Sequence, residues 1–352
     1  MFSISLKRVI FGLILILTAN EVPAFFQKMK GEKKFDWSAT LSAPEEYPVQ
    51  VYRGGVISKE YAQSLQGFGT VDYGWGKEGG AVVMGPDLKS IPDSLEIAWH
   101  SFVGQKNYEG KWDLPKEYIT KLFDEGFKDK ATNRKLTYDT FVVGLAPNGL
   151  VVVWLSGADN RIEVAHFKAQ EVVVDIDNIT DRSKPIFSKK YNDVVLSDLN
   201  KRFNTFERIE KDDYPKKDLY ENYRKRYLWR HSIVLPQGGK LDNLIFHLYN
   251  GEIKSIVNDD LIFPKYKKEA VFKRCYFHWV DKDQKMRGVW IEDFDDEELY
   301  RAYEELGNET QVDFIVKIVE PSSVIIFLKS DLREIEIKRY KKTMESWSIK
   351  KR

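Results

Sequence analysis

The residues that most often carry out catalysis or bind metals are few and scattered in this sequence. The five histidines are His100, His166, His231, His247 and His278. None of them stands in an HExxH motif or at another spacing of His, Cys and carboxylate that recruits zinc. Residues 175–181 contain three aspartates, but they lack the glycine and the closing glutamate of a calcium loop. The sequence therefore predicts no metal site.

The single cysteine, Cys275, lies in an apolar segment and is the next candidate for chemistry. A cysteine nucleophile needs a paired histidine in an electropositive pocket. His278 stands three residues further along an expected strand, which places it on the opposite face of the sheet. One thiol also cannot form an internal disulfide, so packing alone must stabilise the fold. We expect Cys275 to be an unreactive core residue.

The remaining patterns do not predict an enzyme either. Ser101, Ser156 and Ser330 stand in no nucleophile elbow. The acidic run at residues 295–298 suits a metal less well than the first turn of a helix, where carboxylates cap free N–H groups and offset the helix dipole. We expect no catalytic residues and no cofactor. A hydrolase is only the third hypothesis, because convergent carboxylates cannot be assigned from spacing.

A glycine-rich loop carries the strongest candidates for binding. Residues 67–80 hold Tyr73 and Trp75 among several glycines. Glycine lets the backbone adopt positive φ angles, while Tyr and Trp supply large, stiff contact surfaces. The loop could stack on a sugar or anchor a protein partner. The alternative, which is somewhat favoured, is an aromatic plug that folds onto its own sheet.

His100 is the third candidate for binding, and its surroundings occur twice. It follows Trp99, and later in the chain His278 precedes Trp279 in a similar strand-like segment. A duplicated binding residue would need two equivalent pockets, so this symmetry favours a structural role for both histidines. The candidate binding residues are Tyr73, Trp75 and His100.

An internal repeat supplies the elements that must position these residues. Residues 141–167 recur without a gap at residues 314–340, with apolar residues opposite apolar residues and turns at nearly the same places. Upstream of each copy, Trp37 and Trp229 both stand two residues after an aromatic residue. Self-similarity at a fixed offset decides the architecture, and here it predicts one module that occurs twice.

Each copy of this module is expected to contain two strands, one helix and a three-stranded meander. The apolar residues alternate or run together between short turns, as an antiparallel sheet requires. The first helix begins at Pro115, a favoured first helical position, and the second begins after residues 295–298. The predicted fold class is α+β, with two tandem, internally duplicated lobes that each consist of an antiparallel sheet and one packed helix.

The expected domain organisation has four parts. They are a signal peptide at residues 1–24, a first repeat at residues 35–170, a partly helical connector at residues 171–226 and a second repeat at residues 227–343. Two segments near the connector, residues 193–206 and 213–229, have the apolar spacing of helices. The connector is too apolar for a flexible linker, so we expect it to pack against the lobes.

Composition and the N-terminal segment indicate the compartment and exclude some partners. With 352 residues, of which 43% are hydrophobic, the chain is large enough to form two packed cores. Its formal net charge of +1 provides no electrostatic attraction for nucleic acid. Lys7 and Arg8 precede a short apolar run, and Val22 and Ala24 flank a cleavage position, as in a signal peptide. The run is short for a membrane span, so an uncleaved signal anchor is the less favoured alternative. We expect a periplasmic protein.

Several motifs together resemble a known family. They are YPV at 47–49, GWG at 74–76, AWHS at 98–101, GLAPNGLVVVWLSG at 144–157 and YRKRYLWR at 223–230. The sequence resembles an uncharacterised family of exported Gram-negative proteins and lipoproteins, a domain of unknown function, over nearly all of the mature chain. Many of these relatives carry a lipobox cysteine, which this sequence lacks. The resemblance provides no catalytic residues, and it implies an immunity protein that acts beside a secreted antibacterial toxin, such as one delivered by type VI secretion.

Two hypotheses of different class follow. The first is a non-enzymatic periplasmic protein that binds another protein, as an immunity or inhibitor protein does with a toxic effector, and whose two lobes form a clamp of standard interface size. The alternative is a periplasmic protein that binds a carbohydrate or another cell-wall ligand through Tyr73 and Trp75. Neither hypothesis involves nucleic acid, and contact with the membrane would be limited to an uncleaved signal anchor.

Overall fold

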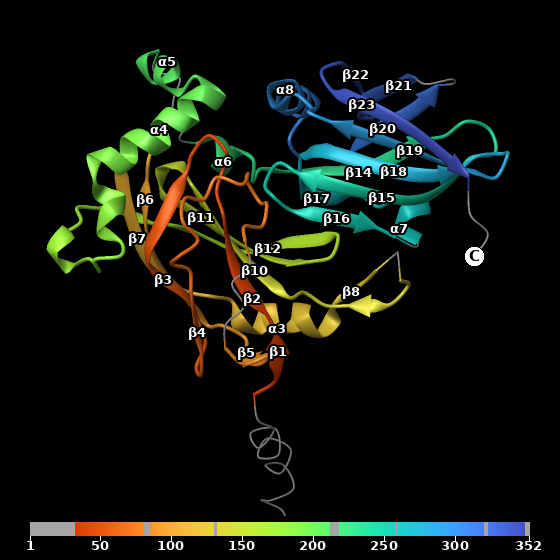
Figure 1. Cartoon of the computed structure of the whole chain (residues 1–352). Helices are drawn as coiled ribbons and strands as arrows, with labels where there is room; N and C mark the ends of the chain where they lie inside the picture. Colours follow the sequence, from red (N-terminus) through yellow and green to blue (C-terminus); the bar gives the residue numbers. More distant parts are fainter. Residues whose placement is uncertain are drawn as a thin grey trace, which may run out of the picture.

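The computed structural model describes residues 32–80, 85–129, 132–211, 218–257, 259–319 and 323–348. The chain is a mixed α+β protein built mostly of sheets, which confirms the predicted class (Figure 1). The expected signal peptide, residues 1–24, lies outside the described residues. Within the described part of the chain, no helix is long and apolar enough to cross a membrane.

The first half, residues 34–172, contains two groups of strands. One group runs in the order β2 (Ser38–Ser42), β10 (Thr140–Ala146), β11 (Leu150–Gly157) and β12 (Asn160–Lys168). The other runs in the order β13 (Gln170–Val172), β7 (Lys106–Asp113), β6 (Ser94–Ser101), β3 (Val49–Ile57) and β4 (Ala62–Ser64). Apolar side chains from both groups form one core, to which α3 (Lys116–Glu125) adds Ile119 and Phe123.

The second half, residues 226–348, also contains two groups of strands. One runs in the order β17 (Lys267–Ala270), β14 (Arg226–Val234), β20 (Val312–Val319), β21 (Ser323–Lys329) and β22 (Glu334–Ile337). The other runs in the order β16 (Ile253–Ile256), β15 (Lys240–Leu248), β18 (Phe272–Val280), β19 (Lys285–Glu292) and β23 (Lys341–Ser348). They share a second core, to which α8 (Asp296–Leu306) adds Leu299 and Tyr303.

Other short elements lie outside these groups or at their margins. They include β1 (Lys34–Asp36), which pairs with β5 (Leu88–Ser90), β8 (Phe127–Lys128), which pairs with β9 (Lys135–Leu136), and α7 (Asp259–Ile262). The pairing of β1 with β5 has a counterpart in the second half, where the start of β14 pairs with β17.

Strand pairing follows one scheme in the two halves. An early strand pairs in parallel with the first strand of a meander in each half: β2 with β10, and β14 with β20. Trp37 and Trp229 also make matching hydrogen bonds. Their Nε1–H groups donate to the carbonyl oxygens of Ser90 at 3.1 Å and Ala270 at 3.2 Å. The same corner of each half is therefore fixed by a buried tryptophan.

Each half differs from the single antiparallel sheet that the sequence predicts. The structure has two groups of strands in each half, and one pair in each half is parallel, so the prediction was wrong on this point. Apolar alternation specifies which face of a strand is buried, but it does not name the partner strand. The partners Ala39 and Phe141 are distant in the sequence, and no local pattern links them.

One sheet continues from the first half into the second. β12 pairs with β16 through Arg161 and Ile253, which yields a nine-stranded sheet with β2 and β23 at its edges (Figure 1). β11 is buried along its whole length, because the first core covers one face, while Tyr220 and Trp75 pack with Trp154 on the other. The halves are thus joined by sheet hydrogen bonds and by packing.

The connector packs on the outside of the first half. α4 (Lys189–Phe203) contributes Leu196 and Leu199, which pack with Tyr52 of β3 and with Phe102. The α4 helix confirms the expected helix over residues 193–206, and two shorter helices follow. They are α5 (Thr205–Glu210) and α6 (Leu219–Asn222).

The predicted helix over residues 213–229 is wrong at its C-terminal end. The structure describes a helix only at α6, and the strand β14 begins at Arg226. Tyr220, Tyr223 and Tyr227 stand at helical spacing, which suggested a longer helix. However, Tyr227 and Trp229 are both buried with a period of two, and their backbones pair with β17. Tertiary pairing overrides the helical spacing here.

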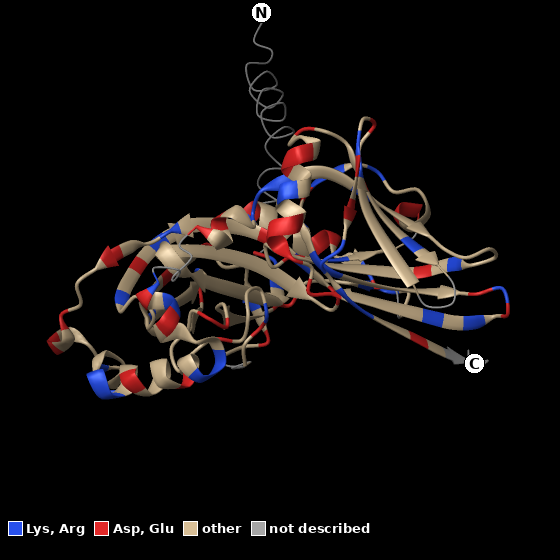
Figure 2. Cartoon of the chain, turned by 90° about the horizontal axis from the view of Figure 1, so that it is seen from above, with Lys and Arg blue, Asp and Glu red and all other residues tan. Residues whose placement is uncertain are grey.

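Charged side chains are distributed over both halves. Figure 2 shows Lys and Arg interspersed with Asp and Glu along the described elements. Many of them form exposed ion pairs, such as Lys268 with Glu309, and pairs of this kind contribute little stability. Positive and negative side chains therefore balance each other locally as well as over the whole chain.

The acidic run before α8 caps the helix, and a substitution can measure this role. The Asp295 carboxylate accepts a hydrogen bond from the backbone N–H of Glu298 at 2.8 Å, whereas α3 has no side-chain cap. Asp295→Ala should lower the free energy of unfolding by about 1 kcal/mol in urea titrations, because the N–H loses its partner. Glu297→Ala is the control, since Glu297 is exposed in the same turn. Equal effects of the two substitutions would contradict this role.

Candidate functional site

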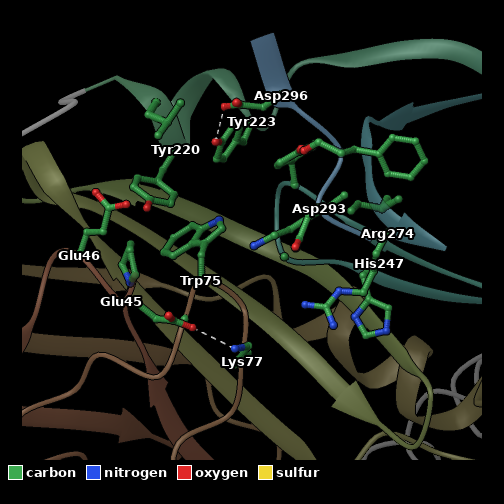
Figure 3. Close-up of a pocket in the computed structure, with 18 of the residues that line it drawn as sticks. Glu45, Glu46, Trp75, Lys77, Tyr220, Tyr223, His247, Arg274, Asp293 and Asp296 are labelled. Atoms are coloured by element: carbon green, nitrogen blue, oxygen red, sulfur yellow. Dashed lines mark hydrogen bonds and ion pairs between the residues drawn. The ribbon is translucent and has the colours of Figure 1, made fainter. Parts of the chain in front are cut away.

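A cleft of about 910 Å³ lies where the two halves and the connector meet (Figure 3). It is lined by residues from 44–47 and 74–77 of the first half, 219–223 of the connector, and 247–252, 273–274 and 293–296 of the second half. Its volume falls within the range of about 300–1,000 Å³ that is usual for ligand sites, which often lie between structural units. The cleft is the candidate site.

Two glycines beside the cleft lie in close contact across the junction of the halves. Gly76 has φ +77° and Gly251 has φ +91°, a region that side chains with a Cβ rarely adopt. A Cβ on Gly76 would lie 2.6 Å from Cα of Gly251, and a Cβ on Gly251 would lie 2.8 Å from the Trp154 ring. The loop of the first half and the turn of the second half can approach closely only because both residues are glycine.

Aromatic rings form one wall of the cleft. The Trp75 ring meets Trp154 edge to face at 4.9 Å and lies 5.1 Å from Tyr220. Tyr223 lies 4.8 Å from Tyr249. These contacts come from three segments of the chain, so they hold the connector against both halves. Trp75 remains partly exposed, and it offers the cleft a firmly held apolar surface.

Tyr223 also provides a polar contact in this wall. Its hydroxyl group donates a hydrogen bond to Oδ2 of Asp296 at 2.6 Å, at the start of α8 (Figure 3). Burial raises the pKa of Tyr223 well above its usual range, and the hydrogen bond to Asp296 raises it further. The hydroxyl group therefore stays protonated and acts as a fixed donor.

Charged side chains form the rest of the lining, and many of them are paired with each other. The pairs are Lys77 with Glu45 at 3.0 Å, Arg339 with Asp295 at 2.7 Å and Lys341 with Asp293 at 2.9 Å. All of these pairs are partly exposed, so water and a bound molecule can compete for them. The lining thus combines aromatic surface with both signs of charge.

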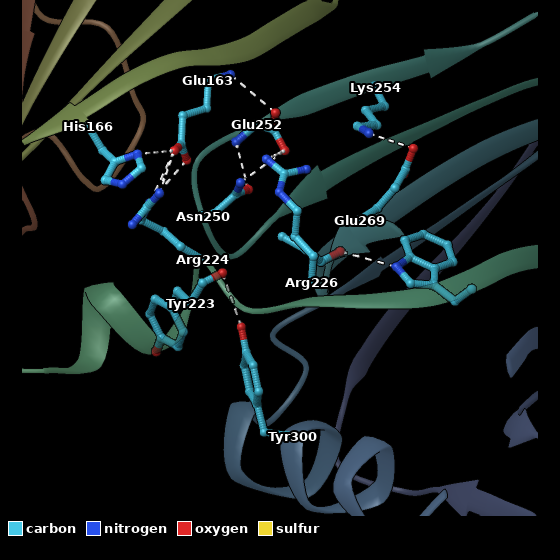
Figure 4. Close-up of polar contacts among 12 residues, drawn as sticks. Glu163, His166, Tyr223, Arg224, Arg226, Asn250, Glu252, Lys254, Glu269 and Tyr300 are labelled. Atoms are coloured by element: carbon cyan, nitrogen blue, oxygen red, sulfur yellow. Dashed lines mark hydrogen bonds and ion pairs between the residues drawn. The ribbon is translucent and has the colours of Figure 1, made fainter. Parts of the chain in front are cut away.

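A buried polar network holds the halves together beside the cleft (Figure 4). Arg224 of the connector donates from Nε and Nη2 to the Glu163 carboxylate of β12 at 3.1 and 2.8 Å. Glu252 of the second half accepts from the backbone N–H of Glu163 at 3.1 Å and pairs with Arg226 at 3.1 Å. Asn250 donates to the same Glu252 carboxylate at 2.9 Å. The network links both halves and the connector through two buried carboxylates.

Of the aromatic residues predicted to bind, the structure brings only Trp75 to the cleft. Tyr73 is 39% exposed, lies next to Gly79 and does not line the cleft. Trp75 packs on Trp154 of its own sheet, as the plug interpretation expected, yet it also faces the cleft. Trp75 therefore has the packing that the plug interpretation expects and a position in the cleft that a binding role requires.

His100 lies elsewhere, under α4. It is 5% exposed, with Nδ1 2.8 Å from Oδ1 of Asn107 and Nε2 2.9 Å from Oδ1 of Asn192. The Asn192 amide nitrogen donates to the carbonyl oxygens of Ile186 and Ser188, so its oxygen is left to accept from His100 Nε2–H. In this position His100 ties β6 to α4 and does not line the cleft.

Most of the charged residues of the cleft were not predicted from the sequence. Glu45, the adjacent pair Lys273 and Arg274, and Asp293 come from three separate segments with no shared motif. The one signal that could have located the junction was the Asn-Gly turn at residues 250–251, whose glycine has to lie against a second glycine. That pairing is visible only in three dimensions.

Cys275 is fully enclosed in the second core, and we predict that it is unreactive. The side chain is 1% exposed, and burial raises the pKa of its thiol well above the usual range. His278 points to the other face of β18, because burial alternates along this strand. Ellman's reagent should therefore react with one thiol per chain in denaturant and with none in the native protein within minutes. Rapid labelling of the native protein would contradict the placement.

Metal ligands do not gather in the described part of the chain. Among its residues, no three His, Cys, Asp or Glu side chains come close enough to hold an ion. The carboxylates of the cleft are instead held by cations or by hydroxyl and amide donors. The arrangement is suited to binding a polar molecule or a protein segment.

The comparison with protein families supports the expected membership of a family of unknown function. A family described as "Protein of unknown function (DUF2931)" matches residues 23–216. The chain belongs to this family. No curated protein and no solved structure matches the chain. The DUF2931 match includes the first half and the Glu45–Lys77 side of the cleft, and it ends within the connector, before β14.

Proposed function

We propose that this DUF2931 protein is a non-enzymatic periplasmic binding protein whose cleft takes up part of another protein. In this proposal it acts as an immunity protein that neutralises a secreted antibacterial effector. The cleft between the halves carries the proposal, since it combines a suitable volume with a firmly held aromatic wall and a charged rim. Binding energy in protein interfaces concentrates on Trp, Tyr and Arg side chains in such positions.

Rigidity of the junction supports a binding role. The nine-stranded sheet, the contact of Gly76 with Gly251 and the buried Glu163 and Glu252 carboxylates fix the cleft walls before anything binds. A preformed site loses less conformational entropy on association than a flexible one. This arrangement suits an inhibitor, which must bind its target tightly and, unlike an enzyme, does not need to release a product.

We further propose that the two halves are copies of one module. Support comes from the matching strand orders and from the matching hydrogen bonds of Trp37 and Trp229. In addition, Phe141 meets Trp37 edge to face, as Phe314 does with Trp229, and the two phenylalanines occupy equal positions in the sequence repeat. The cleft then lies between unlike surfaces of two related units. The signal-peptide pattern at residues 1–24 supports the periplasmic location.

Co-expression with candidate secreted effectors taken from the genes adjacent to that of this protein tests the proposal. Cells that export the effector into the periplasm should survive with the protein and die without it, and the two proteins should form a complex on a sizing column. Trp75→Ala should weaken the complex by about tenfold or more. Tyr73→Ala is the matched control in the same loop, and it should bind as the wild type does. Equal killing with and without the protein, and no complex, would exclude this function.

A second candidate is a protein that binds a carbohydrate or another cell-wall ligand. The gathering of Trp75, Tyr220 and Tyr223 beside charged side chains favours it, because sugars stack on aromatic rings and donate hydrogen bonds to carboxylates. A glycan array should then show binding by the wild type that is lost in Trp75→Ala and kept in Tyr73→Ala. Absence of binding to any glycan would remove this candidate.

A further inference from the structure

A β-bulge on the wall of the cleft places two cations side by side. β15 pairs with β18 so that His247 lies opposite Arg274 and Leu248 lies opposite Phe272, which leaves Lys273 as an extra residue on β18. Neighbouring residues of a regular strand point to opposite faces, whereas a bulge re-aims a side chain. Lys273 and Arg274 both line the cleft as a result.

Other nitrogen-bearing side chains approach these two from different elements. His247 lies on β15, Arg161 on β12 and Lys77 on the loop of the first half, and all three line the cleft. Arg161 and Lys77 each face a carboxylate: Arg161 Nη2 lies 2.8 Å from Glu78, and Lys77 Nζ lies 3.0 Å from Glu45. Their charges are therefore largely compensated within the protein.

Lys273 is not compensated in this way. It makes no hydrogen bond or ion pair with any residue that the structure describes, and it is exposed to the water in the cleft. Glu45 and Asp293 act on it only from a distance, because Glu45 pairs with Lys77 and Asp293 pairs with Lys341. Among the described residues, Lys273 thus has no counter-charge in contact, whereas Arg274 lies 4.0 Å from Glu292.

The electrostatics of this part of the cleft favour a negative charge. Partial burial between the cleft walls disfavours the charged form of Lys273 and so lowers its pKa, and the positive charges of Arg274 and Lys77 lower it further. Burial, followed by the charges of Arg274, Arg161 and Lys273, lowers the pKa of His247 to about 4. His247 is neutral at pH 7 and can donate a ring N–H group. A negative group placed among these side chains would relieve their mutual repulsion.

We propose that Lys273, Arg274 and His247 form an anion subsite that receives a carboxylate of the bound protein. This inference rests on the proposed protein-binding function, and it specifies an Asp or Glu side chain, or a C-terminus, as the group that enters the cleft. Arg274 and Lys273 supply charge-assisted donors, and His247 supplies a neutral one. Trp75 lines the same cleft and would contact apolar side chains of the bound protein next to this carboxylate.

A carboxylate fits this subsite better than a phosphate group. Glu45 and Asp293 stand close enough to act on Lys273, so they limit the net positive charge of the subsite. Both acidic residues repel an entering anion, and this repulsion is smaller for a singly charged carboxylate than for a doubly charged phosphate. The subsite is therefore matched to the acidic groups that proteins themselves carry.

NMR of the ring-labelled histidines in the full chain tests the subsite at pH 7 and constant ionic strength. The probe is N-acetylglutamate amide, which has one carboxylate, and N-acetylglutamine amide is its neutral control. The His247 signal, assigned with His247→Gln, should shift saturably with the first probe and not with the second. Lys273→Gln should weaken this binding by about tenfold or more, while Lys190→Gln, an exposed lysine on α4, should leave it unchanged.

Three results would overturn the assignment of these residues as a carboxylate subsite. They are equal shifts with the two probes, equal affinity in Lys273→Gln and the wild type, or a larger saturable response to inorganic phosphate. The remaining histidine signals report that each variant is folded. Failure of the protein-binding function is distinguishable, because the effector would then not bind even though the glutamate probe does. Conversely, an effector that binds wild type and Lys273→Gln equally would retain the function and exclude the subsite.

Discussion

Gly76→Ala and Gly251→Ala are each expected to lower the free energy of unfolding by about 3 kcal/mol. A positive φ angle costs about 1 kcal/mol in a residue with a Cβ, and a forced backbone shift in a packed region adds about 1–3 kcal/mol. Both terms apply here, because the new Cβ would lie 2.6 Å from the Gly251 backbone or 2.8 Å from the Trp154 ring. Urea titration followed by fluorescence measures the loss.

Substitutions of two other glycines in the loop that contains Gly76 distinguish the cost of a positive φ angle from the cost of the steric clash. Gly69 has φ +70° with nothing within 4 Å of an added Cβ, so Gly69→Ala should show only the conformational cost of about 1 kcal/mol. Gly80 has open space and no positive φ, so Gly80→Ala should be nearly neutral. If all four substitutions had the same effect, the close contact between the halves would be refuted.

Glu252→Ala should be the most damaging single change in the polar network. The Glu252 side chain is 2% exposed and accepts from Asn250, from the backbone of Glu163 and from Arg226. Removal of one member of a buried ion pair leaves the partner without compensation and typically costs about 3–5 kcal/mol. The exposed pair of Lys268 and Glu309 is the control, and Glu309→Ala should cost less than about 0.5 kcal/mol. A small effect of Glu252→Ala in urea would contradict the role of the network.

Acid titration gives an independent check on Glu252. Burial alone would raise the pKa of its carboxyl, but the charges of Lys254 and Arg226, with the Asn250 and Glu163 donors, outweigh burial and lower it. A lowered pKa in the fold contributes stability above the unfolded pKa of about 4.3, and this contribution is lost as the pH falls through the folded value. The stability of the wild type should thus decrease more steeply below about pH 4.3 than that of Glu252→Gln. Parallel pH curves would show that the carboxylate is not held as described.

The α+β fold class was predictable because it depends on local patterns. The apolar spacing of residues 141–167 and 314–340 places strands β10 to β12 and β20 to β22, and Asp295 marks the start of α8. The parallel partner of β10 was not predictable, since alternation specifies a buried face and not a neighbour. One sheet continues across both halves through the pairing of β12 with β16, and the amino-acid composition does not indicate this pairing.

The candidate site was predictable only through Trp75. Its neighbouring glycines signalled an unusual loop, but the same signal also pointed to Tyr73, which lies outside the cleft. His100 stood beside a tryptophan in a repeated pattern, and the structure places it under α4. Lys273 could not be found, because a regular strand would have placed Lys273 and Arg274 on opposite faces. A bulge arises from the pairing of two strands, and the sequence of one strand does not specify it.

Hydrogen exchange of the full chain, with and without an effector that it is shown to bind, tests most directly whether the cleft is the binding site. We expect slower exchange in the complex at residues 44–47, 74–77, 247–252 and 273–274, with exchange in α4 unchanged. Protection confined to α4 and α5, with unaltered exchange in all four cleft segments, would contradict this expectation.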